Sequence, residues 1–291
     1  MAGKIGWIGT GVMGRSMCLH LRKAGYEVAV YNRSKDKAQD VLDAGAVWCD
    51  TPAGVADGSE AVFSIVGYPR DVEEVFLGSG GVLAATASGS MVIDMTTSEP
   101  ALAKRLHEQA AERGVASLDA PVSGGDLGAR AGTLAIMVGG DRADYDRAMP
   151  YFEIMGENIA YMGSAGAGQH TKMSNQILIA STMVGVVESL LYGHKAGLDR
   201  DEIIAVIGKG AASCFAINNL APRIVKGDFE PGFYIKHFVK DMGIALAEAQ
   251  AMRLALPGLS LANQFYTAAM AEGLEDRGTQ ALYKVLERLS S

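Results

Sequence analysis

The chain has 291 residues, of which 49% are hydrophobic and 20% charged, and its formal net charge is −7. This composition is typical of a globular protein, and the acidity argues against nucleic-acid binding. The three cysteines, Cys18, Cys49 and Cys214, are far apart and form no C-x-x-C pair, so we expect no disulfide framework and no metal site.

No segment of the sequence predicts a membrane or export function. The longest apolar stretch, residues 177–187, is short and is interrupted by Ser, Thr and Gly, so we expect it not to span a bilayer. A strand is expected from residue 4, which leaves no room for a signal peptide before it. We therefore expect a cytoplasmic protein.

The first predicted elements are a buried strand over residues 4–8, a helix over 12–24 that ends at Gly25, and a second strand over 27–31. Between the first strand and the helix, three glycines have the spacing G-x-G-x-x-G. That spacing alone is weak evidence in a chain with 36 glycines. Its place between a strand and a helix is stronger evidence, because the helix N-terminus offers N–H groups to a pyrophosphate. We predict a dinucleotide site formed by Gly9, Thr10, Gly11, Val12, Met13 and Gly14.

The loop after the second strand, YNRS at residues 31–34, indicates which dinucleotide binds. An NAD enzyme usually has a carboxylate here that accepts a hydrogen bond from the ribose 2′-hydroxyl. Asn32 and Arg33 are donors instead, and Arg33 matches a 2′-phosphate in charge and geometry. With Ser34, they predict NADP(H); the alternative is an exposed arginine in a polar loop.

Further strands are expected over residues 61–66, 91–95, 116–120 and 133–140, alternating with helical segments. This alternation predicts a doubly wound parallel sheet. Ser98 is expected to cap a helix with Pro100 in its first turn. Thr96 follows a strand at a carboxyl end, where open α/β sheets bind ligands.

From residue 164 the strand signals stop. The glycine-rich stretch SAGAG at 164–168 precedes a predicted helix over residues 169–196, which we expect to be buried nearly all round. Lys172 and Asn175 lie three residues apart on one face of that helix. The sequence thus predicts an α/β domain of the Rossmann type over residues 1–163 and an all-α domain over 164–291, joined by a long interdomain helix.

Four segments in order resemble the β-hydroxyacid dehydrogenase family, which includes 3-hydroxyisobutyrate dehydrogenases, tartronate semialdehyde reductases and glyoxylate/succinic semialdehyde reductases. They are GWIGTGVMG (6–14), DAPVSGG (119–125), GAGQHTKMSNQ (166–176) and KHFVKDM (236–242). The middle two are the more specific.

The resemblance implies a role for each matching residue. Lys172 is the implied catalytic lysine, because an ammonium on a rigid helix can protonate the alkoxide formed when hydride reaches an aldehyde carbon. The implied substrate-binding residues are Ser123, Gly124, Gly125, Asn175, Lys240 and Asp241. Separately, we expect Phe233 to contribute to the wall of the substrate pocket. The implied cofactor contacts, beyond the glycine turn and its following loop, are Val66, Thr96 and Lys240.

The sequence therefore predicts NADPH-dependent reduction of small anionic aldehyde acids, or the reverse oxidation of hydroxy acids, by a homo-oligomer, either a dimer or a tetramer. Two related chemistries are alternatives. A 6-phosphogluconate-type oxidative decarboxylase would have His where Ser174 stands, and an imine reductase typically replaces the lysine. A non-catalytic dinucleotide-binding sensor is a third alternative, although Lys172, Ser123 and Asn175 are all present.

Overall fold

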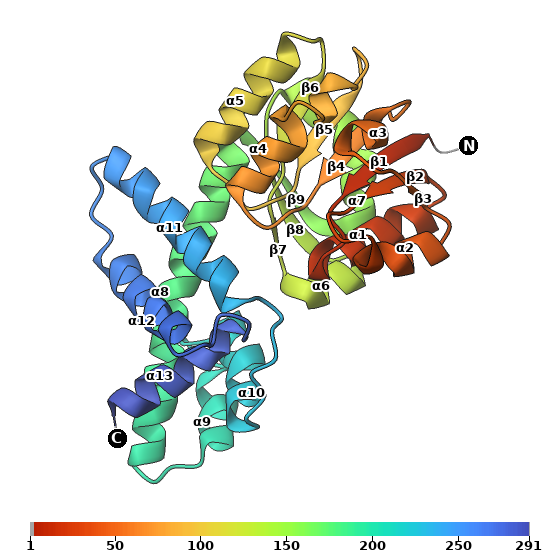
Figure 1. Cartoon of the computed structure of the whole chain (residues 1–291). Coiled ribbons are helices and arrows are strands. Elements are labelled where there is room, and N and C mark those ends of the chain that lie inside the picture. The colour runs from red at the N-terminus through yellow and green to blue at the C-terminus, as the bar shows by residue number, and fades with distance from the viewer. Residues whose placement is uncertain (1–2, 291) are drawn as a thin grey trace. The chain divides into compact units, whose positions relative to one another are not determined.

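The chain divides into two compact units, Met1–Lys172 and Met173–Ser291. The computed structural model describes residues 3–290. The first unit is an α/β domain and the second is built from helices (Figure 1). Helix α8 (Ala167–Lys195) begins in the first unit and continues through the second.

A nine-stranded sheet lies at the centre of the described part of the first unit. Six parallel strands are arranged in the order β3-β2-β1-β4-β5-β6, which is the order of a dinucleotide-binding sheet. They are β1 (Lys4–Ile8), β2 (Glu27–Tyr31), β3 (Val47–Trp48), β4 (Ala61–Ser64), β5 (Met91–Asp94) and β6 (Ala116–Asp119). The sequence prediction of a doubly wound parallel sheet is confirmed for these strands.

The remaining three strands depart from the parallel arrangement. Strand β8 (Leu134–Gly139) runs antiparallel to β6 and to β7 (Val122–Ser123), and β9 (Gly156–Gly163) is parallel to β8. The expectation that residues 133–140 join the parallel set was wrong. Only residues 124–133 connect β7 to β8, and a parallel crossover needs a dozen residues or more.

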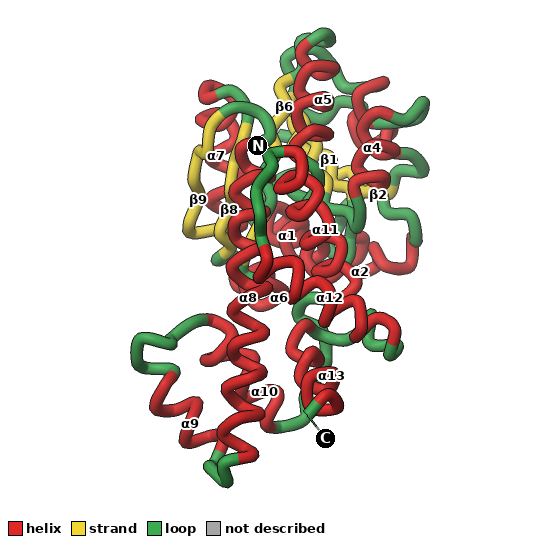
Figure 2. Tube along the Cα trace, turned by 90° about the vertical axis from the view of Figure 1, so that its left-hand side faces the viewer, coloured by secondary structure: helices red, strands yellow, loops and turns green. Residues whose placement is uncertain are grey.

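Alternate residues of the strands face two separate cores. Ile5 and Trp7 of β1 pack with the helices on one face, whereas Ile8 packs with those on the other. Both faces are therefore buried, as is usual for a parallel sheet. In Figure 2, where strands are yellow and helices red, α7 lies beside β8 and β9. The first face carries α1 (Val12–Lys23), α2 (Gln39–Asp43), α6 (Gly125–Ala131) and α7 (Arg142–Met155), and the second carries α3 (Pro52–Ala56), α4 (Pro69–Leu77) and α5 (Pro100–Ala111).

The start of α5 differs by one residue from the sequence prediction. Helix α5 begins at Pro100 with Glu99 in the N-cap position, so Ser98 is not its cap. The backbone N–H of Ser98 instead donates to Oε1 of Gln169 at 2.9 Å. This long-range bond draws Ser98 into the interior, and such a contact leaves no signal in the local sequence.

The second unit is organised around α8. Its core includes Met173, Ala180, Met183, Val187 and Leu190 from this helix. By length and composition alone α8 could cross a membrane, but its packing in this core accounts for its apolar residues. Leu178 and Tyr192 are exposed, so the expectation that the helix is buried nearly all round was wrong for one side. The other helices are α9 (Arg200–Ile207), the π-helix η3 (Ala216–Leu220), α10 (Ala221–Val225), α11 (Ile235–Ala251), α12 (Pro257–Ala271) and α13 (Leu282–Leu289).

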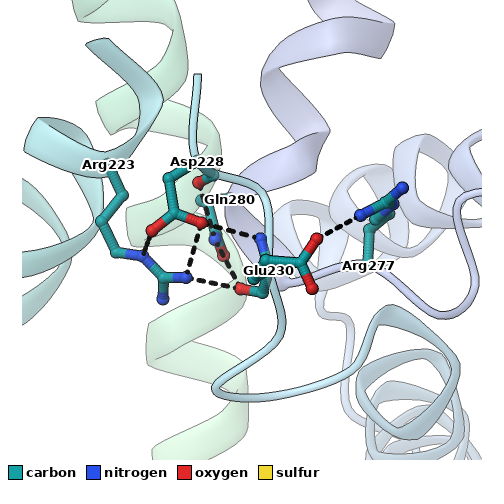
Figure 3. Close-up of polar contacts among 5 residues, drawn as sticks. All are labelled: Arg223, Asp228, Glu230, Arg277 and Gln280. Atoms are coloured by element: carbon teal, nitrogen blue, oxygen red, sulfur yellow. Dashed lines mark hydrogen bonds and ion pairs between the residues drawn. The ribbon is translucent and has the colours of Figure 1, made fainter. Parts of the chain in front are cut away.

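Five polar residues fix the loop that precedes α11 (Figure 3). The Nε and Nη2 atoms of Arg223 donate to the carboxylate of Asp228 at 2.8 and 3.1 Å, and Nη2 also donates to the carbonyl oxygen of Glu230. Gln280 Nε2 donates to the carbonyl oxygens of Asp228 and Glu230, and Arg277 pairs with the Glu230 carboxylate. The hydrogen bond from Arg223 lowers the pKa of Asp228 to about 2. These contacts hold the loop that leads to Phe233.

We predict that Arg223→Ala loosens this loop. The substitution removes every contact of the guanidinium with Asp228 and Glu230, so amide hydrogen exchange over residues 228–234 should accelerate by about tenfold or more. Arg277→Ala is the matched control, because its guanidinium pairs with the exposed Glu230 carboxylate. Exchange over the same residues should change less than about twofold in this variant. Equal exchange in wild type and Arg223→Ala would show that the loop is held by other contacts.

Candidate functional site

Each glycine of the turn after β1 has a separate steric role. Gly9 has φ +95°, and a Cβ there would lie 2.1 Å from the carbonyl oxygen of Ile65. A Cβ at Gly14 would lie 2.1 Å from the carbonyl oxygen of Gly9, whereas one at Gly11 would meet nothing within 4 Å. Gly9 therefore permits the turn, Gly14 permits close packing of helix and turn, and Gly11 leaves open space where a pyrophosphate can approach.

The first turn of α1 is suited to bind an anion. The helix begins at Val12 with Gly11 as N-cap and no capping side chain, and its first N–H groups have no intrahelical partners. The turn before the helix is held by residues at the end of β2, because Gly9 N–H donates to the Tyr31 carbonyl and Thr10 N–H donates to Asn32 Oδ1. The Thr10 hydroxyl is buried and has no partner. These features fit a dinucleotide.

Asn32 and Arg33, in the loop after β2, have different surroundings: the Asn32 side chain is hydrogen-bonded to the backbone, and the Arg33 side chain is exposed. Asn32 accepts from Thr10 N–H and its Nδ2 donates to the Ser34 carbonyl at 2.8 Å. Its amide group thus links the glycine turn to the loop. The Arg33 side chain is 87% exposed, and its guanidinium lies 3.7 Å from the Asp71 carboxylate. Arg33 can therefore reach a phosphate in solvent, and Asn32 supports the loop that carries it.

Two further predicted cofactor residues meet at the ends of β4 and β5. The Val66 N–H donates to the Thr96 hydroxyl at 2.9 Å, and the Thr96 N–H donates to Asp94 Oδ1 at 3.0 Å. Thr96 is buried. The two loops that follow adjacent parallel strands are thus bonded to each other at the carboxyl edge of the sheet.

Asp119 and Gln169 are buried beside these loops, and the sequence interpretation gave neither a role. Asp119 Oδ1 accepts from Gly166 N–H at 2.8 Å, and Oδ2 accepts from Gln169 N–H at 2.9 Å. Burial raises the pKa of Asp119 to about 6, although the backbone hydrogen bonds oppose that rise. Their only sequence signal was membership of the DAPVSGG and GAGQHTKMSNQ segments.

The predicted catalytic lysine lies in the same unit. Lys172 is three residues after Gln169 on α8 and is only 7% exposed, which is rare for a lysine. Ser123 ends β7, and Gly124 and Gly125 begin α6 with φ of +130° and +63°. These positive angles let the chain turn sharply from strand to helix and present the Ser-Gly-Gly segment at the helix start.

In the second unit, a buried polar chain joins three other predicted residues. Asn175 Nδ2 donates to Gln176 Oε1 at 2.7 Å, and Gln176 Nε2 donates to Asp241 Oδ2 at 2.6 Å. Asp241 Oδ1 lies 2.9 Å from Lys240 Nζ. Gln176, which the sequence interpretation did not single out, is the link. Phe233 takes no part in this set of hydrogen bonds. Its ring packs against the ring of Phe238 at a centroid distance of 5.4 Å.

Two family models match the chain. The family model described as the NAD binding domain of 6-phosphogluconate dehydrogenase matches residues 4–163. A second, described as NAD-binding of NADP-dependent 3-hydroxyisobutyrate dehydrogenase, matches residues 166–286. The fold and the site thus define an NAD(P)-dependent oxidoreductase.

Similar individual proteins show which family of oxidoreductases the chain belongs to. The chain is 54% identical to a probable 3-hydroxyisobutyrate dehydrogenase-like protein of Arabidopsis thaliana, over 99% of this chain and 86% of the relative. It is 38% identical to 2-hydroxy-3-oxopropionate reductase of Escherichia coli, over 99% and 98%. The solved structure of Mycobacterium tuberculosis 3-hydroxyisobutyrate dehydrogenase with L-serine has a TM-score of 0.89 at 30% identity, covering 98% of this chain and 99% of that one. The chain belongs to the β-hydroxyacid dehydrogenase family, which confirms the resemblance.

Two substitutions in the glycine turn should separate folding from cofactor binding. Gly14→Ala forces a Cβ onto the Gly9 carbonyl and should destabilise the first unit by about 1–3 kcal/mol. Gly11→Ala has room in the protein, so thermal unfolding should change little while the Kd of NADPH rises at least about tenfold. Thermal melts and fluorescence titration with NADPH measure the two effects. Unchanged NADPH affinity in Gly11→Ala would contradict the pyrophosphate assignment.

Proposed function

We propose that the protein reduces small aldehyde acids to hydroxy acids with NADPH, and catalyses the reverse oxidation with NADP⁺. The observation that carries this proposal is Lys172, a buried lysine on a helix whose first turn is hydrogen-bonded to Asp119 at the end of β6 and to the Thr96 carbonyl after β5. The relatives support the substrate class, because they are named as a 3-hydroxyisobutyrate dehydrogenase-like protein and a 2-hydroxy-3-oxopropionate reductase, and these names denote hydroxy and oxo acids.

The protein's own groups supply binding and proton transfer. NADPH, when bound at the glycine turn, supplies the hydride. The Lys172 ammonium stabilises the developing alkoxide and donates its proton to that oxygen. The Ser123 hydroxyl and the N–H groups of Gly124 and Gly125 are the donors for the substrate carboxylate. Asn175, Lys240 and Asp241 are proposed as further substrate-binding groups.

NADP(H) is proposed over NAD(H) on the basis of Arg33. Its exposed guanidinium can bind a 2′-phosphate with two hydrogen bonds. The loop after β2 has no carboxylate from Asn32 to Ser34 that would accept from a ribose 2′-hydroxyl. The family model that matches residues 166–286 is described for an NADP-dependent enzyme, which supports the same preference.

The substrate proposal is tested with four acids, namely glyoxylate, succinic semialdehyde, tartronate semialdehyde and methylmalonate semialdehyde. Initial rates of NADPH oxidation should identify at least one of them as a substrate. Lys172→Ala should lower turnover of that acid by roughly 10²- to 10⁴-fold, the usual contribution of a positioned acid–base group, while the Kd of NADPH stays within about threefold. Near-normal turnover of Lys172→Ala would rule out its assignment as the proton donor.

A second measurement tests the cofactor preference. Arg33→Ala removes a charge-assisted contact worth about 1.5–3 kcal/mol, which corresponds to roughly 10- to 150-fold in the ratio of kcat/KM for NADPH to that for NADH. Arg105→Ala is the matched control, because Arg105 is a half-exposed arginine on α5 paired with Glu73. Both cofactors are compared at one ionic strength. A wild type that prefers NADH, or an unchanged ratio in Arg33→Ala, would contradict the preference.

A further inference from the structure

The buried carboxylate of Asp119 is bonded to the start of α8. Asp119 is the last residue of β6, is 4% exposed, and accepts from the N–H groups of Gly166 and Gln169 with its two oxygens. N–H groups at a helix start have no intrahelical acceptors, and the positive end of the helix dipole favours a carboxylate there. The carboxylate at the end of β6 therefore holds the start of α8 with two hydrogen bonds.

Two glycines bring the helix start unusually close to the sheet. A Cβ at Gly168 would lie 2.4 Å from the Met137 carbonyl oxygen and 2.6 Å from that of Asp119. A Cβ at Gly139 would lie 2.6 Å from Asp119 Oδ1 and 2.8 Å from the Gly168 N atom. Backbone and carboxylate are thus in direct contact, so a small movement of either one displaces the other.

The Gln169 side chain extends this connection to the cofactor loops. Its Oε1 accepts from Ser98 N–H at 2.9 Å and its Nε2 donates to the Thr96 carbonyl at 2.7 Å. The Thr96 hydroxyl in turn accepts from Val66 N–H. One continuous set of buried hydrogen bonds therefore joins the start of α8 to two loops proposed to contact the cofactor.

We propose that Asp119 and Gln169 are positioning residues that set the place of Lys172 relative to the cofactor loops. Lys172 is one helical turn beyond Gln169, so a shift of the first turn moves its ammonium by a similar amount. Misplacement of a reacting group by about 1 Å can cost about 10²-fold in rate. The inference rests on the proposed role of Lys172 as proton donor.

The test is a double-mutant cycle with NADPH and whichever of the four acids has the highest wild-type kcat/KM. Asp119→Asn replaces one accepting oxygen by an N–H₂ donor, so one backbone N–H loses its acceptor. We expect kcat to fall about 10- to 100-fold with the KM of the acid within about threefold. Added to Lys172→Ala, the same change should lower kcat less than about threefold, because residues that act as one unit are not additive.

Two other variants complete the cycle. Asp146→Asn makes the same chemical change at an exposed ion pair on α7 and should leave kcat unchanged. Gln169→Met removes both side-chain hydrogen bonds but keeps the backbone N–H from which the Asp119 carboxylate accepts a hydrogen bond. Gln169→Met should also lower kcat in the wild-type background but much less in Lys172→Ala. It takes the place of Asp119→Asn in the cycle if thermal melts show that Asp119→Asn is unfolded.

The outcomes separate the inference from the function on which it rests. If Lys172→Ala keeps normal turnover, the proposed role of Lys172 fails. If Lys172→Ala is slow but Asp119→Asn and Gln169→Met lower kcat by equal factors in both backgrounds, only the positioning role fails. A loss of kcat in the wild-type background that vanishes in Lys172→Ala supports it.

Discussion

The arrangement of the first unit's candidate site depends on the hydrogen bonds between the buried Asp119 carboxylate and the start of α8. A buried charge is costly unless hydrogen bonds satisfy it. Here two backbone N–H groups and a helix N-terminus do so. Burial raises the pKa of Asp119 to about 6 and so outweighs the lowering by these bonds. The helix that carries Lys172 begins where this charge is satisfied.

The sheet topology explains why the other candidate residues gather at one edge. Successive parallel strands end at the same side of a sheet, and the loops that follow β1, β2, β4 and β5 carry Gly9, Arg33, Val66 and Thr96 respectively. Each of these loops is short and is bonded to a neighbour, as Thr10 is to Asn32 and Val66 is to Thr96. The candidate cofactor-binding residues therefore lie on loops that are hydrogen-bonded to one another at one edge of the sheet.

Local patterns in the sequence predicted the elements well because their causes are local. The strand–turn–helix at Gly9 to Gly14 and the long helix, predicted over 169–196 and found at Ala167–Lys195, depend on hydrophobic periodicity and glycine placement. The direction of β8 could not be predicted in this way, since it follows from the short connection through α6. Ser98 was mistaken for a helix cap for a similar reason, because its partner Gln169 is 71 residues away. The site residues came from motif resemblance, whereas Gln176 and the roles of Asp119 and Gln169 emerged only from three-dimensional contacts.

Transfer of hydride from NADPH to the aldehyde carbon of a small acid is the central claim, and isotopic labelling tests it most directly. The protein would be incubated with NADPH carrying two deuterium atoms at nicotinamide C4 and with each of the four acids in turn. Nuclear magnetic resonance of the product should show one deuterium on the carbon that bears the new hydroxyl group, formed in step with NADP⁺. Absence of deuterium at that carbon with all four acids would contradict the account.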